Sequence, residues 1–118
     1  MKKSVSISPL AKRHLKQMGD NIKMARLRRN LSIRAIAQRA GLSVNTVMTL
    51  ERGGAGVSIG AIANVLHSLG IADHVSLIAQ SDLLGRKLQD LELTTTKKSA
   101  SKKSKTIQAS KGTNNETN

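Results

Sequence analysis

The sequence predicts an all-α fold, and three observations support that prediction. Apolar residues recur at spacings of three and four in successive short segments, as they do on one face of a helix. Most of these segments follow a Ser or Asp that can cap a helix and end at a Gly or Asn that can stop one. The 118 residues are 38% hydrophobic but include no Phe, Tyr, Trp or Cys, so the core must be aliphatic. This length allows one compact domain plus a tail.

A long first helix is expected to begin at Ser8-Pro9, with the serine as N-cap and the proline at the first helical position. Gly19-Asp20 could split this segment into two helices. Its end is expected near Asn30, whose side chain tolerates the left-handed conformation. Its apolar stripe consists of Leu15, Met18, Ile22 and Ala25.

Two short helices follow, and they meet across Gly41. Ser32 can cap a helix over residues 33–39, and Ser43 can cap a second helix over residues 44–52. Gly41 supplies the positive φ that the turn between them requires. The residues expected to pack the two helices together are Ile36, Ala37, Ala40, Leu42, Val47 and Leu50.

A fourth helix is predicted from Ser58 to about Leu69, with Gly70 as its stop. The glycine-rich stretch 53–56 before it is expected to be a loop. It lacks the lysine pattern and the flanking strand of a phosphate-binding loop.

The C-terminal part predicts one or two further short helices over residues 71–93, with Asp82 as a cap. From Thr94 onward the sequence is rich in Lys, Ser and Thr, and Ile107 is its only large apolar residue. Such a segment cannot bury enough apolar surface to offset its ordering entropy, so we expect a disordered basic tail.

Positive charge is unevenly distributed along the chain. The formal net charge is +13, with +8 in residues 1–29 and −2 in residues 54–93 by count. This balance points to a polyanion such as nucleic acid or an anionic membrane surface. Without aromatic side chains to stack single-stranded bases, duplex backbone is the favoured target. No signal peptide and no apolar run of about 18 residues is visible, so a soluble, cytoplasmic protein associated with the nucleoid is expected.

The segment Leu31–Gly53 has the layout of a helix-turn-helix motif, in which the second helix lies in the DNA major groove. Residues 20–70 resemble the Cro and phage-repressor (XRE) class of these domains through Ser32, Ala37, Gly41, Ser43, Val47 and the run Leu50-Glu51-Arg52-Gly53. The resemblance implies a compact lambda-repressor-like bundle of about five helices, here with an extra C-terminal helical segment. The stretches GVSIGAIANVLHSLGI and LLGRKLQDLEL are also similar to HipB-type antitoxins, which partner HipA-family serine/threonine kinases.

The resemblance assigns base reading to four residues at the start of the second motif helix: Ser43, Val44, Asn45 and Thr49. The Asn45 amide can pair with two edge atoms of adenine, and Val44 methyl groups suit a thymine methyl. Met48 is a weaker candidate. The residues expected to contact phosphates are Ser32, Gln38, Thr46, Arg28, Arg29 and Arg34. Ser32 and Ser43 would cap their helices with or without DNA.

Glu51 and Arg52 are interpreted as a structural pair or a helix-end charge. The histidines at 14, 67 and 74 have no metal-ligand spacing, and no nucleophile–base set or pair of carboxylates is evident. Neither an enzyme nor a cofactor or metal is therefore expected.

The expected organisation has four parts: a flexible basic N-terminus (1–7), a helix-turn-helix DNA-binding domain (8–70), a helical extension (71–93) and the disordered tail (94–118). In the extension, Leu84, Leu88 and Leu91 form a stripe that is expected to be a dimer or partner interface. A second interpretation is that these leucines only complete the domain's own core.

The expected function is sequence-specific transcriptional repression by a homodimer bound to a palindromic double-stranded DNA operator. The similarity to antitoxins adds a role as autoregulator of a toxin–antitoxin operon, with a HipA-like kinase as partner. Two alternatives remain: a stand-alone phage-type repressor without a toxin, and a basic protein that coats nucleic acid without sequence preference.

Overall fold

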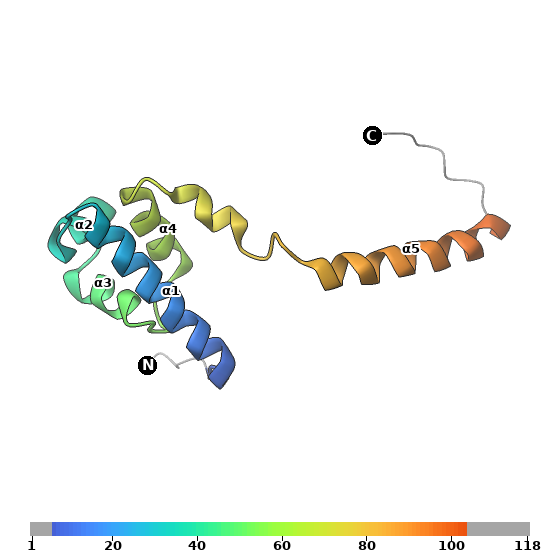
Figure 1. The fold of residues 1–118 in the computed structure, drawn as a ribbon, viewed down its shortest axis with the longest axis horizontal. Coiled ribbons are helices and arrows are strands. Elements are labelled where there is room, and N and C mark those ends of the chain that lie inside the picture. The colour runs from blue at the N-terminus through green and yellow to red at the C-terminus, as the bar shows by residue number, and fades with distance from the viewer. Residues whose placement is uncertain (1–5, 104–118) are drawn as a thin grey trace. The chain divides into compact units, whose positions relative to one another are not determined.

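The computed structural model describes residues 6–103, and it describes side chains as far as residue 94. Within this range the fold is all-α, as predicted (Figure 1). The chain forms two compact units, one ending at Ile78 and the other beginning at Ala79. No helix in the described range is both long and apolar enough to span a bilayer. The helices are α1 (Pro9–Arg28), α2 (Ile33–Ala40), α3 (Val44–Glu51), α4 (Ile59–Ser68), the 3-10 helix η1 (Ala72–Leu77) and α5 (Leu83–Lys103).

Serine N-caps begin the first four helices, as the sequence predicts. In each case the side-chain oxygen accepts a hydrogen bond from the backbone N–H three residues later, which satisfies a donor that the helix itself leaves unpaired. The distances are 3.2 Å for Ser8, 3.0 Å for Ser32, 3.1 Å for Ser43 and 3.1 Å for Ser58.

The predicted helix ends are also confirmed. Asn30 has a φ of 54° after α1, and Gly41 has a φ of 71° after α2. The Leu42 N–H donates to the carbonyl of Ala37 across Gly41 at 2.9 Å, the bond of a Schellman helix end. The turn of the motif therefore depends on a left-handed residue at position 41.

An aliphatic core holds α1 to α4 together, and Val47, Leu50 and Val65 in it have no exposed surface. Close packing of this kind fixes the angle at which α3 crosses its neighbours. Met18, Leu42 and Ile71 are among the partly buried residues packed around it. The buried members are Ile22, Ala25, Ile36, Ala37, Ala40, Val47, Leu50, Val65, Leu66 and Leu69.

Gly19 does not split α1, which is one continuous helix of 20 residues. A Cβ atom at Gly19 would lie 2.6 Å from the carbonyl oxygens of both Leu50 and Glu51. The glycine is thus needed for the close approach of α1 to the end of α3 rather than for a break in the helix.

The prediction of one or two short helices over residues 71–93 is correct for η1 but not for α5. Asp82 caps α5 as predicted, because its carboxylate accepts the Gly85 N–H at 3.1 Å. However, α5 has 21 residues and continues to Lys103, past the predicted start of the tail at Thr94. The disorder argument considered only burial, whereas residues 94–103 extend a helix that residues 83–93 already form, so they need no new nucleation, and the Lys and Ala among them favour a helix locally. Residues 104–118 of the predicted tail, and residues 1–5 of the predicted flexible N-terminus, lie outside the described residues.

Candidate nucleic-acid interface

Helix α3 buries one side in the bundle and leaves the other open. Its buried residues are Val47, Leu50 and Glu51. A helix turns about 100° per residue, so Asn45 lies opposite this buried side, and Thr49 and Arg52 share its direction. Asn45 and Arg52 are exposed, and Thr49 is half-buried. The outer face of α3 is here defined as Asn45, Met48, Thr49 and Arg52, and Val44 is exposed beside it at the N-terminal end of the helix.

This outer face lies between two grooves. The first, of about 270 Å³, runs between α1 and α3 and is lined by Met48 and Arg52 from the outer face together with Lys16 and Lys23 of α1. The second, of about 480 Å³, lies on the α4 side and is lined by Asn45 and Thr49 among others. The outer face therefore forms a ridge with a basic groove along one side.

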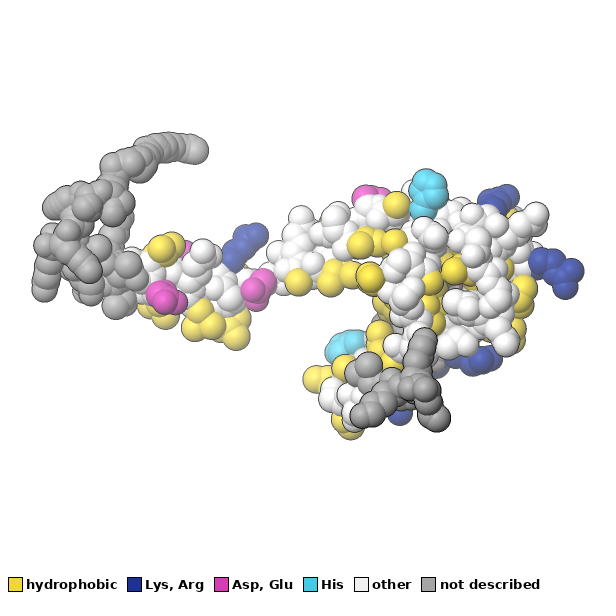
Figure 2. Space-filling view, turned by 180° about the vertical axis from the view of Figure 1, so that it is seen from behind, with side chains coloured by type: hydrophobic (Ala, Val, Ile, Leu, Met, Phe, Trp, Pro, Cys, Tyr) yellow, Lys and Arg dark blue, Asp and Glu magenta, His cyan; other side chains and the backbone are white. Residues whose placement is uncertain are grey.

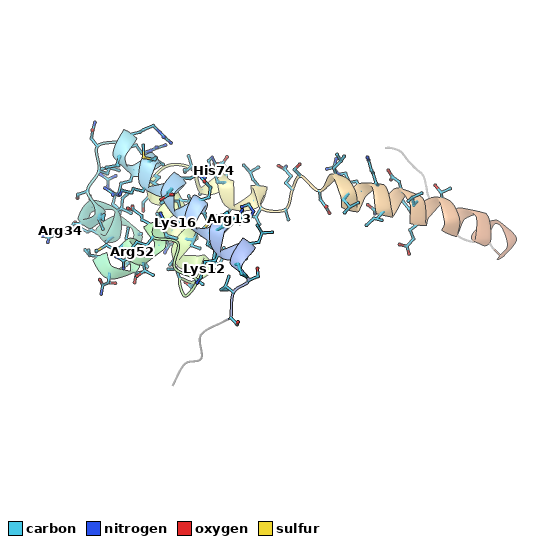
Figure 3. The ribbon with its side chains drawn as sticks, turned by 60° about the horizontal axis from the view of Figure 1, so that its bottom comes forward. Lys12, Arg13, Lys16, Arg34, Arg52 and His74 are labelled. Carbon is cyan, nitrogen blue, oxygen red and sulfur yellow. The ribbon has the colours of Figure 1, made fainter. Side chains whose placement is uncertain are left out.

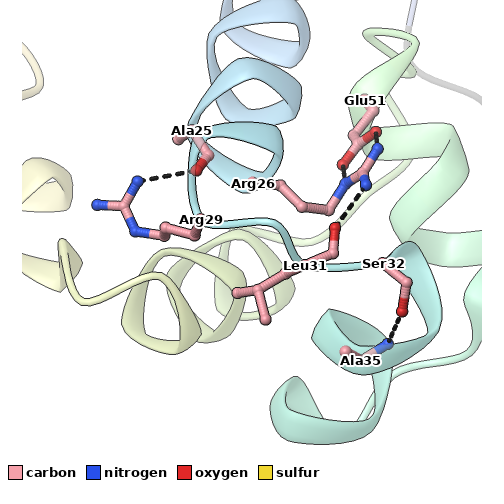
Figure 4. A network of polar contacts seen from close by, with 7 residues as sticks. All are labelled: Ala25, Arg26, Arg29, Leu31, Ser32, Ala35 and Glu51. Carbon is pink, nitrogen blue, oxygen red and sulfur yellow. Dashed lines mark hydrogen bonds and ion pairs between the residues drawn. The ribbon is translucent and has the colours of Figure 1, made fainter.

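A buried ion pair fixes α3 against α1 (Figure 4). The Arg26 guanidinium donates to both carboxylate oxygens of Glu51, at 2.7 and 3.0 Å, and to the carbonyl of Leu31 at 2.8 Å. The two side chains are only 8% and 6% exposed. Hydrogen bonding to Glu51 raises the pKa of Arg26 above its ordinary value, against the lowering effect of burial. Arg26 therefore keeps its charge and joins α1, α3 and the turn before α2.

The structure contradicts a pair between Glu51 and Arg52, but it agrees with the alternative of a helix-end charge, since Arg52 is the C-cap of α3. Glu51 is buried, whereas Arg52 follows it as the exposed C-cap of α3, about 100° further around the helix. Only the tertiary structure reveals Arg26 as the partner, because 25 residues separate it from Glu51 in the sequence. Arg52 is instead available for contact with another molecule.

The N-terminus of α3 is held by the side chains of Ser43 and Thr46. Ser43 Oγ accepts the Thr46 N–H, and the two hydroxyl groups are 2.9 Å apart, within hydrogen-bond distance. Both hydroxyl groups thus have a structural role in the cap. Val44 is 40% exposed beside them. Ser43, Val44 and Asn45 are exposed at the N-terminal end of α3, and Thr49 is half-buried about one turn after Asn45.

Helix α2 supplies polar groups on its own exposed side. Arg34 and Gln38 are one helical turn apart and both exposed, and Ser32 is exposed at the N-cap. Arg34 projects outward from the bundle (Figure 3). These three predicted phosphate contacts are therefore accessible on one element.

Two of the remaining predicted phosphate residues, Arg28 and Arg29, lie elsewhere. Arg28 lines an apolar pocket that α1 forms with α4 and η1, away from the α3 side of α1. The Arg29 guanidinium donates at 2.8 Å to the carbonyl of Leu69, at the end of α4, and at 2.8 Å to that of Ala25. The structure thus does not bring Arg28 and Arg29 together with the outer face of α3.

Sequence reasoning missed Arg52, Lys16 and Lys23 as members of this surface. The periodicity of α3 could have identified Arg52, since it follows Asn45 by seven residues and Thr49 by three. The lysines lie along α1, and only the packing of α1 against α3 places them beside the outer face. Lys16 also forms an exposed ion pair with Asp20 at 2.7 Å.

The profile of the helix-turn-helix domain family matches residues 17–76, more than half of the chain. The chain therefore belongs to that family, and it is a DNA-binding regulator. The match covers the second half of α1, the two motif helices α2 and α3, α4 and most of η1. No curated protein matches the chain.

Proposed function

We propose that this chain is a sequence-specific transcriptional repressor that reads its operator with the outer face of α3. One observation carries the proposal: an exposed asparagine at position 45 stands on a ridge that the rest of the bundle holds rigidly in place. A bundle of this kind presents its second motif helix to the major groove. An asparagine amide can pair with N6 and N7 of adenine, so Asn45 can distinguish one base pair from the others.

The other contacts divide into base reading and backbone positioning. Ser43, Val44 and Thr49 complete the base-reading set around Asn45. Thr46 supports the helix cap and contacts a phosphate. Ser32, Arg34 and Gln38 position the bundle on the backbone from α2. Of the basic residues on α1, Lys16 and Lys23 are better placed than Arg28 and Arg29, because they line the groove beside the outer face.

Repression follows from occupation of the operator by a dimer. One short recognition helix contacts few base pairs, so two half-sites one helical turn apart increase both affinity and specificity. The exposed leucines Leu84, Leu88 and Leu91 of α5 are the surface proposed for this association. In this proposal each part of the chain has its own role. The helix-turn-helix domain (8–70) reads DNA, the helical extension (71–93) associates with a second copy, and the basic tail (94–118) adds non-specific attraction to DNA.

The similarity of residues 56–71 and 83–93 to HipB-type antitoxins supports a narrower proposal, in which the repressor also binds a HipA-like kinase. Such a kinase would contact residues 71–93, the flanks of that stretch or the basic tail. The neighbouring reading frames decide between the two roles. A kinase-like frame beside this gene, whose product binds the purified chain, supports the antitoxin role. Absence of such a frame favours a stand-alone repressor.

Replacement of Asn45 by alanine tests the base-reading role. We expect operator affinity to fall by about 1 to 3 kcal/mol, with relaxed preference at one base-pair position, because a two-bond base contact is lost. Binding to the operator and to single-base variants of it is measured at fixed salt concentration. Asn21→Ala is the matched control, because Asn21 is an exposed asparagine on α1 that lines the pocket facing α4 and η1.

An unchanged ratio between operator and mismatched sites in the Asn45→Ala chain would overturn the base-reading assignment. If the parent chain also binds all duplexes equally and only salt changes its affinity, the protein coats nucleic acid without reading sequence. The high net charge by itself supports that alternative, and the ridge on α3 favours the repressor.

A further inference from the structure

Helix α5 carries an exposed stripe of leucines with the spacing of a coiled coil. Leu84, Leu88 and Leu91 are 68%, 56% and 66% exposed and recur at spacings of four and three. In a heptad lettered a to g, Leu84 and Leu91 occupy d and Leu88 occupies a, the positions that face a second helix. Hydrophobic side chains are visible on the surface of α5 (Figure 2).

Charged residues lie beside this stripe in a pattern that selects one arrangement of two helices. Lys87 falls at position g and Glu92 at position e of the next heptad. In a parallel, in-register pair, the g position of one helix faces the e position of the next heptad on the other helix. Lys87 of each copy therefore faces Glu92 of the other copy, which gives two such pairs, one on each side of the seam. In an antiparallel pair centred on Leu88, Lys87 would instead face Lys87 of the second copy, and the two like charges would repel.

We propose that α5 associates with α5 of a second copy of this chain as a parallel, in-register, two-stranded coiled coil. This inference rests on the dimer of the proposed function, and it adds the element that pairs and the orientation and register of the two helices. The seam has three leucines per copy and ends there, because the next a and d positions are Thr95 and Lys98, so association of the free chains is weak. An operator that binds both copies strengthens this association, because it holds the two α5 helices close together in one complex and so raises their effective concentration.

The parallel orientation has a consequence for DNA binding. Both helices enter the coil from their N-terminal ends, so both helix-turn-helix bundles are attached at the same end, through residues 79–82. Two bundles tethered in this way can occupy neighbouring half-sites on one duplex. The short connection limits the half-site spacings that one dimer can span.

Single cysteines provide the test, because the chain contains no native cysteine. Residues at d positions of a parallel pair face their own equivalents, so we expect Leu84→Cys and Leu91→Cys each to form a disulfide-linked dimer under mild oxidation, both free and on operator DNA. Leu93→Cys is the matched control. It replaces another exposed leucine, at position f, which points away from the seam, so it should form little or no linked dimer.

Three results of the oxidation experiment would overturn the inference. The absence of a linked dimer at position 84 excludes a parallel seam. A disulfide that forms only in a mixture of the Leu84→Cys and Leu91→Cys chains indicates an antiparallel pair. Equal linking at position 93 indicates collision without a defined interface.

The charge pattern gives a second test that leaves the leucines in place. Lys87→Glu sets two acidic residues against each other and should reduce linking through Leu84→Cys. Adding Glu92→Lys restores opposite charges and should restore linking, whereas unchanged linking in the Lys87→Glu chain would contradict the proposed pairing.

Measuring the affinity of the chain for a DNA duplex with a single half-site tests the proposed function independently of the coiled coil. A chain that reads a half-site through Asn45 but forms no linked dimer contradicts the coiled coil alone. A chain that forms the linked dimer without sequence preference contradicts the repressor alone.

Discussion

The two units of this chain use the same kind of apolar stripe for opposite purposes. In the first unit Ile36 and Leu50 are 1% and 0% exposed, whereas Leu84 and Leu88 of α5 are 68% and 56% exposed. The sequence spacing of three and four is the same in both. A stripe therefore predicts that a helix has an apolar side, and the tertiary structure shows whether the chain itself covers that side.

The largest expected effect lies in the first unit, at the ion pair that fixes α3. Glu51→Ala should lower the free energy of unfolding of the bundle by about 3 to 5 kcal/mol, because it leaves the charge of Arg26 buried without its carboxylate. Urea unfolding followed by far-UV circular dichroism measures the loss, since the chain has no aromatic residue for fluorescence. The control is Asp20→Ala, which removes an ion pair whose side chains are 58% and 49% exposed. It should cost less than about 1 kcal/mol, and equal losses would contradict the structural role of Glu51.

Leucine truncation compares the two units directly. Leu50→Ala should lower the unfolding free energy of the bundle by about 2 to 5 kcal/mol, because it removes buried methyl groups and leaves a cavity. Leu84→Ala should leave that free energy unchanged, since Leu84 is exposed. Hydrogen exchange of the α4 backbone amides reports the stability of the bundle separately from α5. A large loss with Leu84→Ala would show that α5 completes the core, the second interpretation of its leucine stripe.

A smaller effect is expected at the turn of the motif. Gly41→Val should destabilise the bundle by about 1 to 2 kcal/mol, because a branched side chain disfavours the φ of 71° found there. No atom lies within 4 Å of the added Cβ position, so the loss comes from the backbone conformation alone. Gly56→Val is the matched control, with the same open space and no positive φ. Thermal unfolding measures both variants, and similar losses would contradict the role assigned to the left-handed turn.

Local sequence features predict most of the first unit. Serine caps, glycine stops and apolar periodicity depend on residues within one or two turns of each other, so the starts and ends of α1 to α4 follow from short segments. The same periodicity places Asn45 and Thr49 on the open side of α3. The family resemblance adds their role in base reading, which stays a prediction until it is measured.

What the sequence determines by itself is therefore the all-α class, the helix-turn-helix motif and the basic character of the chain. The tertiary structure decides the contacts between residues distant in the chain. It pairs Arg26 with Glu51, engages Arg29 at the end of α4 and brings Lys16 and Lys23 beside α3. The physical reason is that caps and stripes are local interactions, whereas a buried ion pair or a groove exists only where two helices pack against each other.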